Sequence, residues 1–327
     1  MNFSCPPALP PRSEPVKNMS CELAIKVDVD TLKGYLEGVP RLLDILGNRG
    51  IKASFFFSMG PDNSGKAIRR IFRKGFLAKM LRTKAPSTYG FKTLLYGTLL
   101  KAPMIVASNP DILRRAVNEG HDCGIHCWDH VLWQDCLLKL SREEIRAELD
   151  KAVKLFSDIV GMLPRSCAAP GWQISGDSLA VQDELGLDYS SDVRGAAPFT
   201  PSMNGFVFRT LQIPTTLPTL DELWGVDGMD ADADAEKVND HYLDLLEPGL
   251  NVHTIHAEME GGAMSGVFAR LLDCCVEGEM AFPTLRDVAS RAGAELKPDA
   301  CGVEMAEIPG RSGKVAMQIE TKGLKLE

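Results

Sequence analysis

Two histidines, His126 and His130, lie four residues apart in the stretch GIHCWDHVLW. If this segment turns helically, the two imidazoles can face one point in space, which is the arrangement of helical zinc sites. The neighbouring Ile125, Trp128 and Trp133 are apolar and favour a partly buried place, where a neutral imidazole ligand is well held. The same spacing also fits two histidines with ordinary roles in the core or on the surface. A metal site therefore requires further ligands elsewhere in the chain.

Two aspartates close together offer a carboxylate ligand. Asp28 and Asp30 are separated by two in the segment KVDVDT, so on a strand both side chains project from the same face. Their charges repel, and a metal resolves the repulsion if one carboxylate binds it while the other stays close as a base. An exposed pair at the end of a strand is the structural alternative. One aspartate with two histidines leaves positions on a metal open for water and substrate, as in hydrolytic sites.

A third segment, NVHTIHAEMEGG, supplies a candidate acid. His253 and His256 differ by an odd number of positions, so on a strand they point to opposite faces and only one can reach the site. His256 lies nearer the carboxyl end of the predicted strand, so we favour it as the general acid that protonates a leaving amine. Cys123 and Cys127 flank the histidine pair, but no second pair of cysteines has zinc-knuckle spacing, so we interpret both as buried thiols.

The elements that position these residues alternate between strands and helices. The segment CELAIKVDVDT has the period of a strand, and SREEIRAELDKAVKLFSDIVG has helical spacing behind a capping box formed by Ser141 and Glu144. Repeated alternation of this kind predicts an α/β protein built on a parallel sheet, either open or closed into a barrel. We expect strands at 21–31, 51–58, 121–126, 164–169, 187–191, 206–213 and 250–257, and helices at 39–50, 109–120 and 141–161.

Composition argues against several classes of protein. The chain has 327 residues and a formal net charge of −8, which disfavours general nucleic-acid binding. Its nine cysteines are odd in number and show no C-x-x-C spacing, and the proline-rich start lacks the apolar region of a secretion signal. We therefore expect a reducing, cytoplasmic location. No apolar run reaches the roughly 20 residues that a membrane-spanning helix needs, so we expect no transmembrane segment.

The predicted domain organisation has one catalytic domain with two tails and an insertion. We expect a disordered tail at 1–20, the catalytic domain at 21–296 and a C-terminal tail at 297–327, whose stretch KVAMQIE could add one edge strand. Within the domain, 61–107 is a basic amphipathic insertion, and its residues 61–101 carry ten basic side chains and one acidic one. We expect this insertion to bind an anionic membrane surface. A solvated surface helix is the alternative, and RNA binding has little support.

The order of these motifs along the chain resembles that of NodB-type polysaccharide deacetylases. The five motifs of that family correspond to VDVDT, HCWDH, CAAPGW, YSSDVRG and TIHAE. The resemblance implies a deformed (β/α)7 barrel of the NodB polysaccharide deacetylase type and a divalent metal ion, for which zinc, manganese, cobalt and nickel are all open. It also implies a set of roles: Asp28 as general base; Asp30, His126 and His130 as metal ligands; His256 as general acid; and Asp192 as the carboxylate that tunes this histidine.

Further stretches of similar sequence narrow the resemblance to one branch of the family. The stretches EGVPRLL, FFSMGPDN, SDVRGAAPF, QIPTTLPT and TIHAEMEG are similar to a branch of deformylases, across most of residues 23–285. This implies removal of the formyl group from 4-deoxy-4-formamido-L-arabinose linked to undecaprenyl phosphate, at the cytoplasmic face of a bacterial inner membrane. The pathway would modify lipid A with aminoarabinose and confer resistance to cationic antimicrobial peptides such as polymyxin. The alternatives are a deacetylase of chitin-like or peptidoglycan saccharides and a non-catalytic membrane-associated module.

The chain departs from the family pattern at three places that bear on the site. Cys127 replaces the hydroxyl residue that usually follows the first histidine, so we expect a hydrogen bond behind the ligands to be weaker or missing. Val29 separates two aspartates that are usually adjacent in the family. Ala168 stands where the third motif usually has an arginine, and we expect Arg194 to position the base or to bind a phosphate oxygen instead. In the same third motif, Pro170 and Trp172 are candidates for substrate binding or positioning.

Overall fold

The computed structural model describes residues 21–67, 93–223, 229, 235–295 and 298–320. The tail predicted at 1–20 and the greater part of the basic insertion predicted at 61–107 lie outside these residues, so their predicted roles stay predictions. Among the described helices, none is long and apolar enough to cross a membrane.

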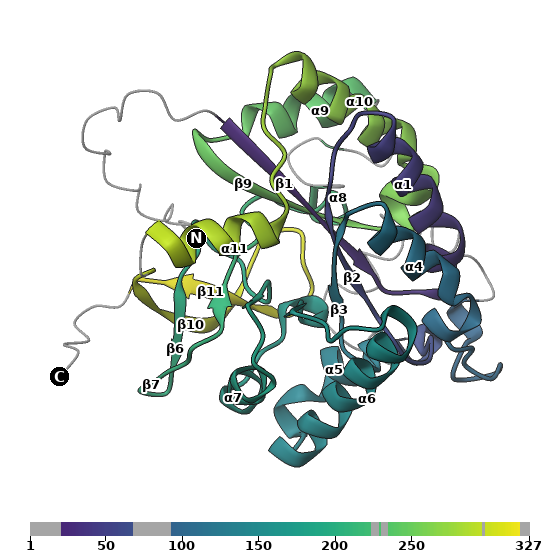
Figure 1. Cartoon of the computed structure of the whole chain (residues 1–327), viewed down its shortest axis with the longest axis vertical. Helices are drawn as coiled ribbons and strands as arrows, with labels where there is room; N and C mark the ends of the chain where they lie inside the picture. Colours follow the sequence, from purple (N-terminus) through teal and green to yellow (C-terminus); the bar gives the residue numbers. More distant parts are fainter. Residues whose placement is uncertain (1–20, 68–92, 224–228, 230–234, 296–297, 321–327) are drawn as a thin grey trace, which may run out of the picture.

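Seven parallel strands form the central sheet (Figure 1), in the order β8-β5-β4-β3-β2-β1-β9. Beyond β8, the backbone N–H groups of Thr216 and Leu217 donate to the carbonyl of Val252 in β9, so a loop bridges the two edges of the sheet. This arrangement is a deformed barrel, which confirms the predicted fold class. The strands are β1 (Cys21–Val29), β2 (Ser54–Phe57), β3 (Asp122–Ile125), β4 (Ser166–Cys167), β5 (Tyr189–Ser190), β8 (Leu211–Gln212) and β9 (Gly249–His256).

In the described part of the chain, six helices surround the sheet in the order α9, α10, α1, α4, α6 and α7, each packed against the next. Helix α6 (Arg142–Val160) begins with the predicted capping box, in which the Ser141 hydroxyl accepts from the N–H of Glu144 and the Glu144 carboxylate accepts from the N–H of Ser141. The other five are α9 (Ala235–Asp244), α10 (Ser265–Glu277), α1 (Val39–Gly47), α4 (Pro110–Asn118) and α7 (Gly176–Leu185). Further helices are α5 (His130–Cys136), α8 (Leu220–Leu223) and α11 (Leu285–Glu295), and short helical turns span Gly34–Gly38, Thr93–Leu95, Val106–Ser108, Leu137–Lys139, Pro170–Trp172 and Met259–Ala263.

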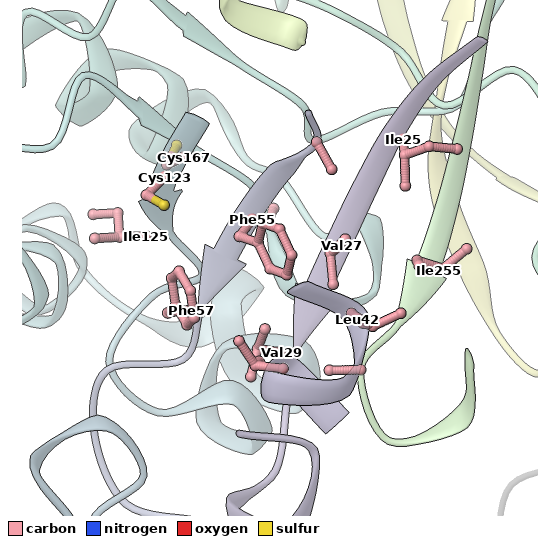
Figure 2. Packing of buried hydrophobic residues seen from close by; sticks show 14 of the residues in the cluster. Ile25, Val27, Val29, Leu42, Phe55, Phe57, Cys123, Ile125, Cys167 and Ile255 are labelled. Atoms are coloured by element: carbon pink, nitrogen blue, oxygen red, sulfur yellow. The ribbon is translucent and has the colours of Figure 1, made fainter. Parts of the chain in front are cut away.

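Alternate residues of β1 face opposite sides of the sheet. Val27 packs with Phe55 of β2 and Leu42 of α1 in the apolar layer beneath the helices (Figure 2). Lys26 and Asp28, the residues before and after Val27, point to the other face of the sheet and are buried inside the barrel. The strand is therefore buried on both sides, but only one side of it is apolar.

Helix α11 closes the amino-terminal end of the barrel interior. Its Leu285 and Val288 pack with Ala24 of β1 and Phe56 of β2 in a second apolar cluster. The N–H of Leu285 also donates to the Ser54 hydroxyl at 2.8 Å. This end also holds the buried polar side chains of Ser54 and Asp122, whereas the candidate site residues lie at the opposite end, where the strands have their carboxyl termini.

A small second sheet has the order β11-β10-β6-β7, with strands β6 (Thr200–Met203), β7 (Phe206–Val207), β10 (Ala300–Glu307) and β11 (Lys314–Ile319). Its edge strand β11 is formed by KVAMQI, as the alternation of that stretch indicates. The N–H of Arg194 donates to the carbonyl of Ala316, and the N–H of Gln318 donates to the carbonyl of Arg194. The segment that we expected to be an appended tail thus supports the loop that follows β5.

The predicted strands are present but several are shorter than expected. The segments 164–169 and 187–191 each contain a strand of two residues. The segment 206–213 is divided between β7 and β8, because the N–H groups of Arg209 and Thr210 donate to the carboxylate of Asp183 instead of a neighbouring strand. A side chain on α7 therefore ends the pairing there.

Candidate metal centre and catalytic residues

Asp30, His126 and His130 converge at the carboxyl ends of β1 and β3. The Nε2 atom of His126 lies 3.3 Å from Asp30 Oδ1, and the Nε2 atom of His130 lies 3.2 Å from Asp30 Oδ2. One ligand atom from each residue lies within 4.8 Å of the others, and among the described residues no other group of three histidine, cysteine or acidic side chains does so. This donor set suits a divalent ion that also binds water.

The two histidines come together without the helical turn that their spacing would also allow. Strand β3 ends at Ile125, and α5 begins at His130. Between them Cys127 has a φ of 60° and Asp129 is extended, so the chain reverses direction within a loop. The reversal still brings the two imidazole centroids to 5.3 Å from each other.

Asp129 caps the helix that carries His130. Its Oδ1 accepts from the N–H groups of Val131 and Leu132, each at 3.1 Å. Its Oδ2 accepts from the side-chain amide of Asn63 at 2.6 Å. Asp129 thus positions the helix that begins with the candidate ligand His130 and is not itself a member of the triad.

Asp62 and Asn63, which the sequence reasoning did not single out, join the loops that carry the ligands. Asp62 Oδ2 accepts from the N–H of Leu32, two residues after Asp30, at 2.8 Å. Its Oδ1 accepts from the hydroxyl of Ser64 at 2.6 Å, and burial raises the pKa of Asp62 above its ordinary value. Their position in the loop that follows β2, at the same end of the sheet, is the signal that could have identified them.

The histidines control the charge state of Asp30. Burial would raise the pKa of this carboxyl, but the charge of His130 and the hydrogen bonds of His126 and His130 outweigh that effect and hold the pKa well below its usual range. Asp30 is therefore a carboxylate at neutral pH. An anionic oxygen beside two imidazole nitrogens is the form in which this set binds a cation.

Asp28, the predicted base, is buried and paired with a lysine. Its Oδ2 lies 3.2 Å from the ammonium nitrogen of Lys26, whose side chain is fully buried. Its Oδ1 has no hydrogen-bond partner among the described residues. One oxygen of this carboxylate is thus engaged by a cation, and the other is left to accept a proton.

His256, the predicted acid, ends β9 beside the site. Burial by itself would lower the pKa of His256, but the carboxylates of Asp30, Asp221, Glu260 and Asp28 outweigh it and raise the pKa above its ordinary value. The backbone N–H of His256 also donates to Glu260 Oε2 at 2.9 Å. This shift favours the protonated imidazole, which is the form that a general acid needs.

His253 points to the other face of β9, as its odd spacing from His256 indicates. Its ring contacts that of Tyr242 with a centroid distance of 4.5 Å. Burial lowers the pKa of His253 to about 3. This imidazole is neutral and belongs to the packing between the sheet and α9.

Asp192 lies at the end of β5 and is completely buried. Its Oδ2 accepts from the side-chain amides of Gln182 at 2.8 Å and Gln212 at 3.0 Å, and burial raises its pKa. The carboxylates that raise the pKa of His256 belong to Asp30, Asp221, Glu260 and Asp28. The geometry therefore places Asp192 in a glutamine network, and its predicted influence on His256 stays a prediction.

Arg194 makes its side-chain contacts with Glu222, not with Asp28. Its Nη1 donates to both carboxylate oxygens of Glu222, at 2.8 and 3.0 Å, and its Nη2 donates to the carbonyl of Leu217. The guanidinium also lies 5.2 Å from the ring centroid of Trp172. The expectation that Arg194 positions the base gains no support from these contacts.

Pro170 and Trp172 form a buried turn after β4. Only 2% of Trp172 is exposed, its indole N–H donates to the Thr215 hydroxyl at 3.2 Å, and its ring lies beside the cations of Lys26 and Arg194. The indole therefore packs beside Lys26, the ion-pair partner of Asp28, and its predicted contact with substrate stays a prediction.

Glu258 and Glu260 follow His256 and were not assigned a role from the sequence. Burial raises the pKa of Glu260 to about 7 and raises that of Glu258 well above its ordinary value, with the charge of Asp30 adding to the effect at Glu258. Neither carboxylate oxygen of Glu258 has a hydrogen-bond partner among the described residues. Their place at the carboxyl end of a parallel strand is the signal that could have found them.

Cys123 and Cys127 are buried thiols, as expected. Burial raises the pKa of Cys127 well above its ordinary value and also raises that of Cys123. A protonated thiol is a poor metal ligand. Neither cysteine belongs to the triad.

Comparison with known proteins agrees with this geometry. The model of the polysaccharide deacetylase family matches residues 29–190. A Shewanella sediminis protein named probable 4-deoxy-4-formamido-L-arabinose-phosphoundecaprenol deformylase ArnD is 37% identical over 298 residues, which are 91% of this chain and 94% of that protein. A protein of the same name from Wigglesworthia glossinidia brevipalpis is 32% identical over 285 residues, 86% of this chain and 96% of its own.

A solved structure shows the same fold. The crystal structure of a probable polysaccharide deacetylase from Pseudomonas aeruginosa has a TM-score of 0.58 to this chain at 16% identity, covering 85% of this chain and 93% of that one. At this level of identity the likeness concerns the fold alone. It agrees with the parallel sheet of seven strands and its surrounding helices.

Proposed function

The chain belongs to the polysaccharide deacetylase family of amide hydrolases, and from this premise we propose that it removes the formyl group from 4-deoxy-4-formamido-L-arabinose linked to undecaprenyl phosphate. The observation that carries the proposal is the similarity to two deformylases of that name over nearly the whole of their length. The cluster of Asp30, His126 and His130 supports it, because amide hydrolysis at a metal needs a site of this kind.

The donor set fits a divalent ion. Asp30, His126 and His130 would hold it through one carboxylate oxygen and two imidazole nitrogens. When bound, such an ion supplies positive charge that polarises the formyl carbonyl and makes water more acidic. The buried Oδ1 of Asp30 lies 3.3 Å from the Nε2 atom of His126, so two of the atoms that would bind the ion already face each other, which supports this assignment.

The chain's own residues carry the two proton transfers. Asp28 Oδ1 accepts a proton from water as the water oxygen forms its bond to the formyl carbon. His256 donates a proton to the sugar nitrogen as the carbon–nitrogen bond breaks. Formate and a free amine are the products, and the amine takes up a proton at neutral pH. A neutral substituent thereby becomes a positive one.

The change of charge gives the proposal its biological setting. A cationic sugar on a lipid A phosphate would weaken the binding of cationic antimicrobial peptides, polymyxin among them. We propose that the enzyme works at the cytoplasmic face of the inner membrane, with the basic insertion at 61–107 binding anionic lipid. That insertion lies mostly outside the described residues.

The decisive experiment measures which acid the protein releases. Purified protein loaded with zinc, manganese, cobalt or nickel is incubated with lipid-linked formamido-arabinose and, separately, with N-acetylated chitin oligomers. We expect metal-dependent formate release from the first and little acetate from the second, with activity lost after chelation and in Asp30→Asn. Acetate release without formate release would favour the saccharide deacetylase, and activity that survives complete metal removal would reject the metal mechanism.

A further inference from the structure

A buried lysine stands two residues before the proposed base. Lys26 and Asp28 lie on the same face of β1, and the ammonium nitrogen of Lys26 is 3.2 Å from Asp28 Oδ2. Lys26 has no exposed surface. We propose that Lys26 is the positioning residue that orients the carboxylate of Asp28 for proton transfer, an inference that rests on the hydrolytic function proposed above.

The surroundings of Lys26 hold its ammonium group in one place. The Nζ atom donates to the carbonyl of Ser191 at 3.1 Å. It also lies 5.8 Å from the ring centroid of Phe56 and 5.3 Å from that of Trp172. A buried cation without partners costs several kcal/mol, and here a carboxylate, a carbonyl and two aromatic rings offset that cost. The ammonium is therefore confined on several sides.

This confinement decides which oxygen of Asp28 receives the proton. Oδ2 is engaged by Lys26, whereas the buried Oδ1 has no hydrogen-bond partner among the described residues. Because both oxygens belong to one planar group, holding Oδ2 also sets the direction of the free lone pairs on Oδ1. In the reaction one O–H bond of water breaks and its proton moves to Oδ1. An electron pair of the water oxygen forms the bond to the amide carbon, and the π pair of the carbonyl moves onto the carbonyl oxygen.

Among the described lysine and arginine residues, Lys26 is the one that pairs with Asp28. Arg194, the residue that the sequence suggested for this task, binds Glu222 and the carbonyl of Leu217. Ala168, in the third motif, carries no charge. The cation beside the base is supplied from within the same strand. The pattern K-x-D-x-D therefore places a cation and the proposed base on one face of β1 and the candidate metal ligand Asp30 directly after the strand.

The test separates positioning from stability. Lys26→Met keeps the length of the side chain and removes the charge, whereas Lys26→Arg keeps the charge. Arg286→Met is the matched control, because Arg286 pairs at 2.7 Å with another buried carboxylate, Asp122 of β3, away from the base. For each purified protein we would measure kcat, KM, bound metal and Tm, using the amide that the wild type hydrolyses.

We expect Lys26→Met to lower kcat by about 100-fold, the lower end of what a general base contributes, with KM changed by less than about threefold and metal content unchanged. Lys26→Arg should recover at least a tenth of the wild-type kcat. Arg286→Met should lower Tm but leave kcat within about threefold of the wild type. This pattern cannot arise from loss of stability alone.

Several outcomes would overturn the proposal. The proposal is wrong if the kcat of Lys26→Met lies within about threefold of the wild-type value. It is also wrong if Lys26→Arg is as slow as Lys26→Met. If Lys26→Met does not fold, Lys26→Gln takes its place, because glutamine keeps a donor for the Ser191 carbonyl but carries no charge. Equal kcat values for Lys26→Gln and Lys26→Arg would then refute the proposal. A wild type that hydrolyses neither the formamide nor the acetamide refutes the proposed function itself, whereas an active wild type with an unaffected variant refutes only the role of Lys26.

Discussion

Asp28 and His256 are register partners on the adjacent parallel strands β1 and β9, and the N–H of Ala257 donates to the carbonyl of Asp28 at 3.0 Å. The proposed base and acid are thus held relative to each other by the hydrogen bonds of the sheet. The candidate metal ligand Asp30 follows the proposed base by two residues. In contrast, the histidine ligands depend on a loop and a helix cap, so the two halves of the site should respond differently to substitution.

Removing the cap at Asp129 should weaken metal binding through His130. Asp129→Ala leaves the N–H groups of Val131 and Leu132 without their acceptor, so we expect the free energy of unfolding to fall by about 1 kcal/mol. The affinity for zinc should fall by about tenfold, because the residues that orient a ligand affect binding on that scale. Denaturant unfolding and competitive metal titration measure both quantities. Asp129→Asn is the control, since asparagine also caps helices and its oxygen can face the same N–H groups. Wild-type metal affinity in Asp129→Ala would contradict the assignment.

The charge of Glu260 should set the upper pH limit of activity. Glu260 is among the carboxylates that raise the pKa of His256. Glu260→Gln removes that charge and lowers the pKa of His256, so the protonated acid is lost at a lower pH. We expect the basic limb of the kcat/KM profile to move down by roughly half a pH unit or more. The exposed Glu277→Gln serves as the control. A basic limb that stays in place would show that His256 is not the group that titrates there.

Stability should fall in mild acid partly because of His121. Burial, together with the charge of Lys52, lowers the pKa of His121 to about 4. The unfolded chain takes up this proton near pH 6.5, so the contribution of His121 to stability is complete above about pH 6.5 and is lost as the pH falls toward the folded-state value. His121→Asn keeps an acceptor for the N–H of Ala53 but does not titrate. When the pH is lowered from 7 to 5, the free energy of unfolding should fall by about 2 kcal/mol less in His121→Asn than in the wild type. Urea unfolding at the two pH values measures this difference, and equal losses would disprove it.

Replacing Arg194 should affect stability more than catalysis. Arg194→Met leaves the buried carboxylate of Glu222 with a weaker set of partners, although Arg311 still contacts it at 3.2 Å. We expect the free energy of unfolding to fall by about 3 kcal/mol, as for other broken buried ion pairs. A double-mutant cycle with Glu222→Gln should show a coupling energy of about 1 kcal/mol or more. A stable Arg194→Met protein whose kcat/KM falls more than about tenfold would instead support the role in positioning or phosphate binding predicted from the sequence.

Local patterns predicted much of the architecture. The alternation in CELAIKVDVDT predicted β1, and the capping box of Ser141 and Glu144 predicted the start of α6, because in both cases the interacting residues are neighbours in the chain. The odd spacing of His253 and His256 placed them on opposite faces of β9 for the same reason. The short strands β4 and β5 were less well predicted, since their ends depend on which neighbouring strand or side chain takes each N–H group.

The sequence by itself determined the fold class and the residue types of the candidate site, because the periodicity of each element and the order of the motifs are local properties of the chain. The tertiary structure alone decided how those residues meet. It brought His126 and His130 together through a loop, and it made Asp129 the N-cap of α5. It also paired Arg194 with Glu222, which is 28 residues away in the chain. It also showed that the neighbour of Asp28 is a fully buried Lys26. These contacts depend on strand order, register and burial, which no short stretch of sequence contains.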